Sequence, residues 1–203
     1  RYVYYGCTKA RDKDCKCGYL EEKEYIRTRP FDASYNKTVK LSDLDESKIK
    51  EFVILSKSRR GFPLSDSIGI KEILTHLNLF SDGKITNAAI LLFGKDSQKY
   101  FISSEVKCAY FHGNDLVKPI PSYKIFKGDL FQLVNMAIDF VLSKIDVSIG
   151  ERNESNDAPV QYELPRAAVA EAIVNAIVHR DYTSNGSVQV MLFRNRLEIW
   201  NPG

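Results

Sequence analysis

Three polar side chains recur at helical spacing within an apolar segment near the C-terminus, PRAAVAEAIVNAIVHRDY. Glu171, Asn175 and His179 stand at positions i, i+4 and i+8, and this spacing places them on one narrow face of a helix. Because polar groups buried without partners are costly, we expect this face to look into a wet cleft. The alternative is that the three residues form only the solvent face of an amphipathic helix.

A glutamate and an asparagine one helical turn apart suit nucleotide chemistry. The carboxylate of Glu171 can orient or deprotonate an attacking water. The amide oxygen of Asn175 is a hard ligand of the kind that Mg²⁺ prefers, and Mg²⁺ accompanies phosphates. This pair is common in proteins, so the rest of the sequence has to support the interpretation.

The helix that positions these residues is expected to run from Pro165 to about Arg180, with proline in the first turn, where its missing N–H is tolerated. Alanine, valine and isoleucine occupy most of its circumference, so the helix is expected to be buried on several sides. A short strand should precede the helix and a β-hairpin should follow it. The expected strands are Val160–Glu163, Ser187–Phe193 and Arg196–Trp200, the last two joined at Arg194-Asn195.

Apolar periodicity and turn residues predict a series of short elements upstream. Two helices, a turn and an apolar segment follow one another, and this order resembles a winged-helix core. The expected elements are a helix capped by Ser42 or Asp43 and ended by Gly61 and Pro63, a helix from about Ser67 to Leu79, a turn over residues 81–84, and an apolar segment of undecided type over residues 86–94.

A strand and a long helix complete this middle region. Glu105–Phe111 alternates like a strand, and Asp129 is placed to cap a helix from Leu130 to about Ile145. The polar stretch Ser148–Pro159, SIGERNESNDAP, is the most linker-like part of the chain and is the expected domain boundary. The buried stripe of the long helix is expected to comprise Leu133, Ala137, Phe140, Val141 and Lys144.

The composition predicts a soluble globular protein, and the succession of expected helices and strands predicts an α+β fold. Of 203 residues, 44% are hydrophobic and 27% are charged, which excludes a disordered tail. No apolar run reaches the roughly 20 residues that cross a bilayer, so no membrane partner is expected. The chain shows no signal-peptide core and its four cysteines do not form a disulfide framework, so a cytoplasmic location is expected. Both ends look cut, which predicts a piece of a longer protein.

Positive charge is concentrated at the N-terminus. Residues 1–40 contain ten Lys or Arg against six Asp or Glu, whereas the remainder contains 19 against 20. The basic segment is either the edge of a nucleic-acid-binding surface or a solvated segment without a partner. Lys57, Arg59 and Arg60 could contact phosphates, although a helix C-terminus also attracts basic residues through its dipole.

Cysteine and histidine offer weak candidates for a metal site. Three thiolates could come from the N-terminal cysteines, Cys7, Cys15 and Cys17, with Cys108 or a histidine as a fourth ligand. Zinc sites more often contain cysteines paired two to four residues apart, so zinc is not expected and reduced thiols are. The isolated histidines, His76 and His112, are expected to be ordinary surface or core residues.

The segment ELPRAAVAEAIVNAIVHRDY, with the following SVQVMLFRNRLEIWNPG, resembles a bacterial family of transcriptional regulators and RecG-like ATP-dependent helicases. The resemblance extends upstream through FDASYNKTVKLSDLD and GIKEILTHLNLFSDGKITNAAILLFGKDSQKYF. In this family a Schlafen/AlbA-type DNA-binding domain leads, and a divergent ATPase domain of the gyrase–Hsp90–histidine kinase–MutL (GHKL) superfamily follows. The resemblance therefore implies the end of the DNA-binding domain in residues 1–40, including the strand-like YVYYGCTKA, a winged-helix-like region in 41–147, a linker in 148–159 and the start of an ATPase α/β sandwich in 160–203.

The resemblance also implies roles for individual residues. Glu171 matches the catalytic, water-activating glutamate of the superfamily, and Asn175 matches its Mg²⁺-binding asparagine. His179 opens the HRDY signature, residues 179–182, which either ties the helix end to the next turn or takes part in catalysis. Asn201 and Gly203 match the adenine-binding turn, but Asn201 replaces its aspartate and supplies no carboxylate. ATP and Mg²⁺ are the implied cofactors, bound by Asn175, His179, Asn201 and Gly203.

The function implied by the resemblance is a DNA-associated bacterial regulator that responds to ATP, with DNA bound mainly by a domain that precedes this chain. The glycine-rich lid that covers the phosphates in the superfamily would follow Gly203, so the fragment itself is not expected to turn over ATP. We find neither a P-loop lysine motif nor helicase motifs in the sequence. Two alternatives stay open: an ATP-dependent nucleic-acid-processing enzyme, and a degenerate ATPase-like interaction module.

Overall fold

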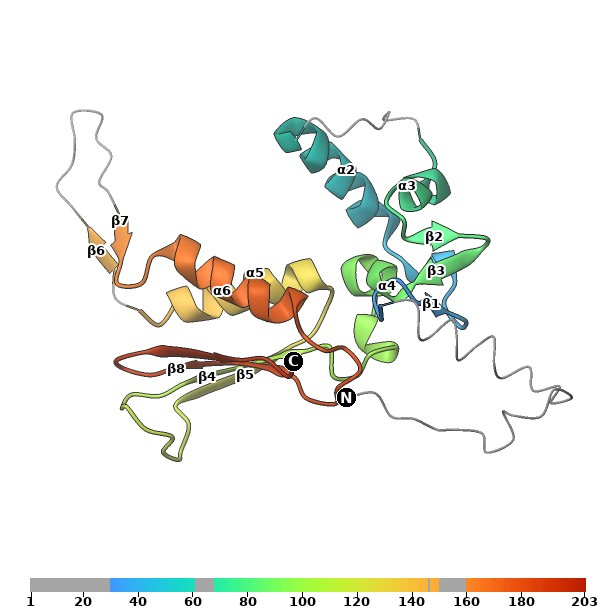
Figure 1. The fold of residues 1–203 in the computed structure, drawn as a ribbon. Helices are drawn as coiled ribbons and strands as arrows, with labels where there is room; N and C mark the ends of the chain where they lie inside the picture. The colour runs from blue at the N-terminus through green and yellow to red at the C-terminus, as the bar shows by residue number, and fades with distance from the viewer. Residues whose placement is uncertain (1–29, 61–67, 146, 150–159) are drawn as a thin grey trace, which may run out of the picture.

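The computed structural model describes residues 30–60, 68–145, 147–149 and 160–203, and shows an α+β fold (Figure 1). The expectations for the basic N-terminal segment, its strand and its cysteines therefore lie almost entirely outside the described residues, as does most of the expected linker. No helix of the described residues is long and apolar enough to span a membrane.

The N-terminal unit (residues 30–104) packs short helices against a small antiparallel sheet of order β1-β3-β2. Its core side chains, Leu44, Ile49, Leu74, Ile90 and Phe93, are each at most 1% exposed. The elements are β1 (Tyr35–Asn36), the 3-10 turn η1 (Leu41–Asp43), α2 (Glu46–Arg60), α3 (Ile70–His76), β2 (Phe80–Ser81), β3 (Lys84–Thr86), α4 (Asn87–Phe93) and the 3-10 turn η2 (Ser97–Lys99).

The C-terminal unit (residues 105–203) is a sheet covered on one face by α5 and α6, which lie side by side (Figure 1). The sheet order is β5-β4-β8-β9, in which β4 and β8 are parallel and the other pairs are antiparallel. A separate antiparallel pair, β6 and β7, connects the two helices. The elements are β4 (Val106–Tyr110), β5 (Ser122–Phe126), α5 (Leu130–Leu142), β6 (Val147–Ile149), β7 (Val160–Tyr162), α6 (Arg166–Val178), β8 (Val188–Leu192) and β9 (Leu197–Trp200).

One hydrophobic core joins the two sides of the expected linker. Val106 and Cys108 of β4 pack with Leu133 of α5, Ile173 of α6 and Val190 of β8. Residues 160–203 do not form a separate unit: α6, β8 and β9 share their sheet and core with β4, β5 and α5. The boundary expected at residues 148–159 therefore falls inside a unit that shares one sheet and one core.

Several local predictions are confirmed. Asp129 caps α5, because its carboxylate accepts a hydrogen bond from the Gln132 N–H at 2.9 Å. The turn between β2 and β3 is tight, with Asp82 and Gly83 at φ of 52° and 75°, conformations that suit a two-residue hairpin. The predicted C-terminal hairpin is β8–β9. The undecided apolar segment is a helix, α4, whose N-cap Thr86 accepts a hydrogen bond from the Ala89 N–H.

Other local predictions are wrong. Helix α2 is capped by Asp45, whose carboxylate accepts from the N–H groups of Ser47 and Lys48 at 3.0 and 3.2 Å, whereas Ser42 and Asp43 lie in η1. Lys144, assigned to the buried stripe of α5, follows the end of the helix and is exposed. Strands β5 and β6 were not predicted.

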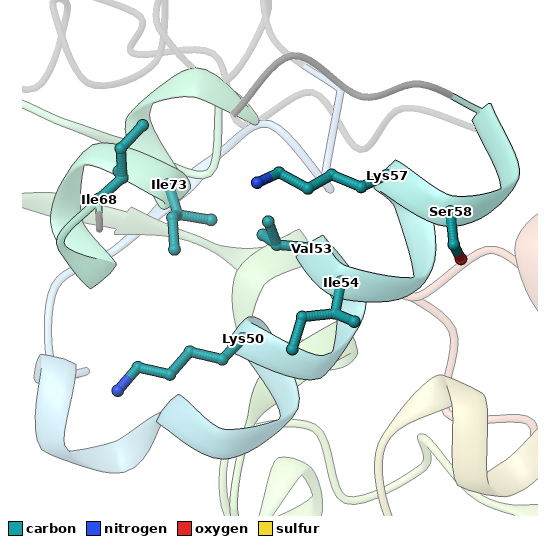
Figure 2. A pocket seen from close by; sticks show the side chains of 7 residues that line it. All are labelled: Lys50, Val53, Ile54, Lys57, Ser58, Ile68 and Ile73. Carbon is teal, nitrogen blue, oxygen red and sulfur yellow. The ribbon is translucent and has the colours of Figure 1, made fainter. Parts of the chain in front are cut away.

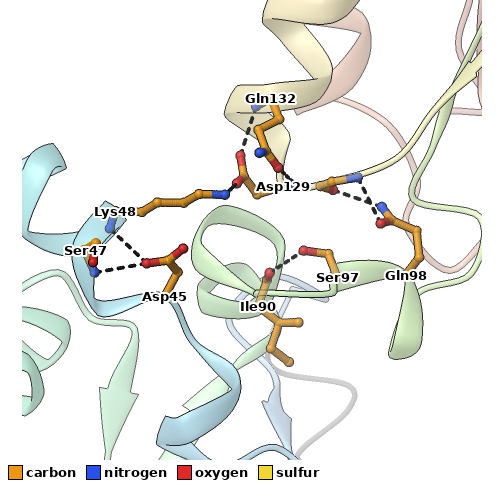
Figure 3. A network of polar contacts seen from close by, with 9 residues as sticks. Asp45, Ser47, Lys48, Ile90, Ser97, Gln98, Asp129 and Gln132 are labelled. Carbon is orange, nitrogen blue, oxygen red and sulfur yellow. Dashed lines mark hydrogen bonds and ion pairs between the residues drawn. The ribbon is translucent and has the colours of Figure 1, made fainter.

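A polar network joins the two units at the first turn of α5 (Figure 3). The Lys48 ammonium of α2 makes an ion pair with the buried carboxylate of Asp129. The side-chain amide of Gln98 donates to the Gly128 carbonyl and accepts from the Gly128 N–H, each at 2.9 Å. The start of α5, and with it the C-terminal sheet, is thus fixed to both α2 and η2.

Candidate functional site

Helix α6 is buried along one side only. Val169, Ile173 and Ile177 pack into the core against α5 and the sheet. Val174 and Val178 are 37% and 58% exposed, so the expectation that the helix is covered on several sides is wrong for the structure described. The many alanines and valines of this segment therefore do not indicate burial on every side, because several of them are exposed.

The face of α6 turned away from the core carries the three predicted polar residues. Glu171, Asn175 and His179 are all exposed, and within the described part of the chain their side chains make no hydrogen bond or ion pair. Their common face follows the i, i+4, i+8 spacing, as expected. His179 borders the groove described below, whereas Glu171 and Asn175 are not among the residues that line it, so this groove is not the single cleft expected along the face.

The residues that follow α6 fix its C-terminal end to the rest of the protein. The guanidinium of Arg180, only 5% exposed, donates to the Ser103 hydroxyl at 2.7 Å and to the carbonyls of Ser184 and Gly186 at 3.2 and 2.6 Å. Burial lowers the pKa of Arg180 from its usual value. Its Nε is buried and has no hydrogen-bond partner in the described structure.

Tyr182 and Asp181 of the HRDY signature make further contacts. The Tyr182 hydroxyl donates to the Ile177 carbonyl at 2.8 Å, and its ring stacks on Phe31 with centroids 6.1 Å apart. The Arg180 guanidinium lies 4.7 Å from the centre of this ring, within cation–π range. Burial raises the pKa of Tyr182 to about 12. Hydrogen bonds from the side chain and N–H of Thr183 lower the pKa of Asp181.

The turn Asn201–Gly203 lies against this same end of α6. The Asp181 N–H donates to the Pro202 carbonyl at 3.0 Å. A side chain built at Gly203 would meet the His179 carbonyl at 3.7 Å. The structure thus brings His179 and Gly203 together, with Asn201 exposed beside them, whereas Asn175 and Glu171 lie one and two helical turns back along the exposed face.

A groove of about 470 Å³ separates the end of α6 from the N-terminal unit. Leu91 and Leu92 of α4, Leu130 of α5 and Val178 of α6 provide apolar walls. The polar part of the lining is His179, Arg180, Asp181, Tyr182 and Asp32, so the whole HRDY signature borders this groove.

Sequence reasoning missed the partners that hold the signature. Ser103 is 77 residues from Arg180, and Phe31 lies in the N-terminal unit. Ser103 lies outside the segments that carry the resemblance, and nothing in the segment that Phe31 opens indicates a contact with α6. Only the folded arrangement of the two units brings these residues to α6. The HRDY residues themselves were a detectable signal, because a charged and aromatic run directly follows an apolar helix.

The donor atoms that Glu171 and Asn175 present on α6 include oxygens, which suit a hard cation such as Mg²⁺ better than a softer metal. Glu171 and Asn175 present oxygen atoms one helical turn apart, and both side chains are open to solvent. Among the described residues, no group of three His, Cys, Asp or Glu could hold a metal ion. Cys7, Cys15 and Cys17 lie outside those residues, and Cys108 is buried in the core.

The remaining candidates lie far from α6 in the sequence. His76 and His112 are both exposed, and the His112 ring packs edge-on against Tyr110 with centroids 5.1 Å apart. Lys57 and Arg59 lie in the last turn of α2, and of Arg60 only the backbone is described. None of these residues lines the groove at the end of α6.

Comparison with known proteins shows a fold and no family. No protein-family model matches the sequence, and no curated protein matches it. Among solved structures, the DIP2311 protein of Corynebacterium diphtheriae is similar over 90% of this chain, with a TM-score of 0.59 and 20% sequence identity. The chain corresponds to 36% of that protein's length. At this identity the likeness shows the fold alone: the chain has an α+β architecture that also occurs in a bacterial protein.

Proposed function

We propose that this chain is part of a DNA-associated bacterial regulator that responds to ATP, and that the exposed face of α6 is its nucleotide-binding surface. One observation carries the proposal: Glu171, Asn175 and His179 share an exposed face, make no polar contact within the described structure, and lead to the turn Asn201–Gly203. An exposed carboxylate and amide on an otherwise apolar helix are available for a ligand.

Each residue has a proposed role. Asn175 supplies an oxygen ligand for Mg²⁺, and Glu171 orients a water toward the phosphates. His179 and Gly203 border the position of the base, where Asn201 offers hydrogen bonds but no carboxylate. Bound Mg²⁺ would neutralise phosphate charge. Arg180 and Tyr182 are positioning residues, because their contacts with Ser103 and Phe31 hold the C-terminal end of α6 in place.

The proposed association with DNA rests on charge. Residues 1–40 contain ten Lys or Arg against six Asp or Glu. Basic residues bind phosphates through release of counterions, so this segment would contribute salt-dependent affinity at the rim of a preceding domain. The contacts of Arg180 with Ser103 and of Tyr182 with Phe31 connect the end of α6 to the N-terminal unit, so a nucleotide bound at α6 could change the position of that unit.

Nucleotide binding by the 203-residue chain tests the proposal. Fluorescence of an N-methylanthraniloyl-labelled ATP should rise on addition of the chain with Mg²⁺ and return toward baseline with EDTA. Asn175→Ala removes the proposed Mg²⁺ ligand and should weaken binding at least fivefold, whereas Glu171→Gln removes only the water-orienting carboxylate and should bind at least as tightly as the unaltered chain. Asn135→Ala and Glu163→Gln, at exposed positions of the same residue types, are the matched controls and should leave it unchanged.

The same titration separates the proposed function from its alternatives. Absence of Mg²⁺-dependent binding at millimolar nucleotide, or equal losses in the controls, would contradict the proposal and favour a degenerate interaction module. Binding accompanied by phosphate release that is lost in Glu171→Gln would favour a nucleic-acid-processing enzyme, because regulation by binding alone needs no turnover.

A further inference from the structure

The segment that joins α6 to β8 contains an asparagine followed by a glycine, Asn185 and Gly186. No other asparagine of the 203 residues precedes a glycine. Asparagine is a chemically labile residue, and a glycine after it has no Cβ to hinder the approach of the asparagine side chain to the next backbone nitrogen. This dipeptide is therefore the position in the sequence best suited to a reaction between a side-chain amide and the main chain.

The structure leaves the two reacting groups accessible to each other. Asn185 is exposed and lies in an irregular stretch between the end of α6 and the start of β8. Within the described part of the chain its side chain makes no hydrogen bond or ion pair. The Gly186 N–H donates to the Ser184 hydroxyl at 3.2 Å, the long end of the range for such a bond. Neither a regular element nor a short hydrogen bond therefore fixes either group.

Packing favours glycine at the second position of this dipeptide. A Cβ built at Gly186 would lie 3.0 Å from the Cβ of Pro202, closer than ordinary van der Waals contact. Pro202 belongs to the turn Asn201–Gly203, and its carbonyl accepts from the Asp181 N–H at 3.0 Å. A larger residue after Asn185 would therefore have to displace this turn.

The carbonyls on either side of Asn185 hold the end of α6. One nitrogen of the Arg180 guanidinium donates to the Ser184 carbonyl at 3.2 Å and to the Gly186 carbonyl at 2.6 Å. The Ser103 hydroxyl of the N-terminal unit donates to the same Ser184 carbonyl at 3.0 Å. A change in the length of the main chain between these two carbonyls would alter the spacing that the guanidinium bridges.

We propose that Asn185 deamidates spontaneously in the folded protein and that the isoaspartate product loosens the end of α6. Hydroxide from the solvent removes the proton of the Gly186 N–H, and the nitrogen attacks the Cγ atom of Asn185. The bond from Cγ to the side-chain nitrogen breaks, and this nitrogen takes a proton from water and leaves as ammonia, which restores the hydroxide. A second water then adds to one carbonyl of the resulting succinimide and opens it to aspartate or isoaspartate. The reaction needs only water, so it does not depend on the proposed nucleotide binding.

The two products have different effects on the bonds of Arg180. Aspartate keeps the main chain and adds one negative charge at an exposed position. Isoaspartate routes the main chain through the former side chain, which lengthens it by one carbon, about 1.5 Å, between the Ser184 and Gly186 carbonyls. Arg180 then cannot keep both hydrogen bonds at their present lengths, and bonds from a charged donor contribute to stability.

Mass spectrometry of the 203-residue chain kept at pH 8 for several days tests the reaction. The proteolytic peptide that contains Asn185 should gain about 1 Da, with isoaspartate in excess of aspartate after chromatographic separation. Asn114, which is also exposed and irregular but precedes Asp115, should react at least tenfold more slowly. Asn185→Gln, whose amide lies one carbon farther from the main chain, should not react at this position. Equal rates at Asn114 and Asn185, or an unmodified Asn185 in protein that stays folded by circular dichroism, would overturn the proposal.

Hydrogen exchange of the purified isoaspartate form tests the effect on α6. Amides of residues 179–187 should exchange at least threefold faster than in the unmodified chain. The Asp181 N–H is the most direct reporter, because its bond to the Pro202 carbonyl depends on how the end of α6 meets the turn. Equal exchange in the two forms would overturn the proposal.

Two controls show that the effect is local and comes from the longer main chain. A second groove, of about 580 Å³, lies between α2 and α3, with Val53 and Ile73 in its lining (Figure 2). It shares no lining residue with the segment 179–187, so its amides should exchange as before. Asn185→Asp adds the charge without lengthening the chain and should exchange as the unmodified protein does. The same acceleration in Asn185→Asp, or faster exchange throughout the protein, would overturn the proposal.

Discussion

Replacement of Arg180 by methionine should destabilise the protein by about 2–3 kcal/mol. Methionine retains most of the apolar stem but removes the hydrogen bonds to Ser103, Ser184 and Gly186. Hydrogen bonds from a charged donor contribute about 1.5–3 kcal/mol each in favourable cases. Two effects reduce their sum: the guanidinium is desolvated with its Nε unpaired, and Ser184 and Gly186 are accessible enough for water to replace the donor.

Urea unfolding followed by circular dichroism measures this effect. For a slope of about 2 kcal/mol per molar urea, the expected loss moves the midpoint down by about 1–1.5 M. Arg166→Met, at an exposed position of the same helix, is the control and should shift stability by less than about 0.5 kcal/mol. Arg180→Lys should fall between the two, because an ammonium cannot reproduce the planar fork. If the free energies of unfolding of Arg180→Met and the control differ by less than about 1 kcal/mol, the hydrogen bonds of Arg180 do not stabilise the protein as proposed.

Four further results are expected. Asp129→Ala removes both the cap of α5 and the partner of Lys48, so it should cost about 2–3 kcal/mol in urea unfolding, whereas Asp129→Asn keeps the capping oxygen and should cost about half as much; equal costs would show that the capping oxygen contributes nothing and that the whole loss comes from the charge. Burial raises the pKa of the Cys108 thiol to about 12, so at pH 8 iodoacetamide should leave the peptide that contains it unmodified until the protein unfolds; labelling in the folded state, read by mass spectrometry, would refute this. Binding to a 20-base-pair DNA duplex should be weak and should fall steeply as NaCl is raised; tight binding that salt does not affect would show that the middle region reads DNA itself. The chain should release no phosphate from ATP above background, because positioning supplies much of the rate; turnover that disappears in Glu171→Ala would contradict this.

Features with strong local signals were predictable from the sequence. The β8–β9 hairpin follows from alternation on both sides of Arg194-Asn195, and α5 follows from Asp129 and an apolar stripe. The face shared by Glu171 and Asn175 follows from spacing alone, because helix geometry fixes it whatever surrounds the helix.

Features that depend on tertiary pairing were not predictable. Strand β5 contains Lys124 and follows prolines, and it becomes a strand through its register with β4, in which Lys124 pairs with Cys108. The cap of α2 was misplaced because Ser42, Asp43 and Asp45 are all good capping residues within four positions. One-sided burial of α6 and the contact of Arg180 with Ser103 depend on which units meet, and a pattern within one segment does not encode that.

An NMR titration of the isotopically labelled chain with Mg²⁺ and a non-hydrolysable ATP analogue tests the central claim most directly. The account predicts shifts of the side-chain amide signals of Asn175 and Asn201 and of the backbone signals of His179 and Gly203, with the signals of the groove between α2 and α3 unchanged. Shifts of the Asn175 side chain should vanish when EDTA removes Mg²⁺. No shift at millimolar analogue, or shifts confined to the N-terminal unit, would contradict the assignment of α6 as the nucleotide-binding surface.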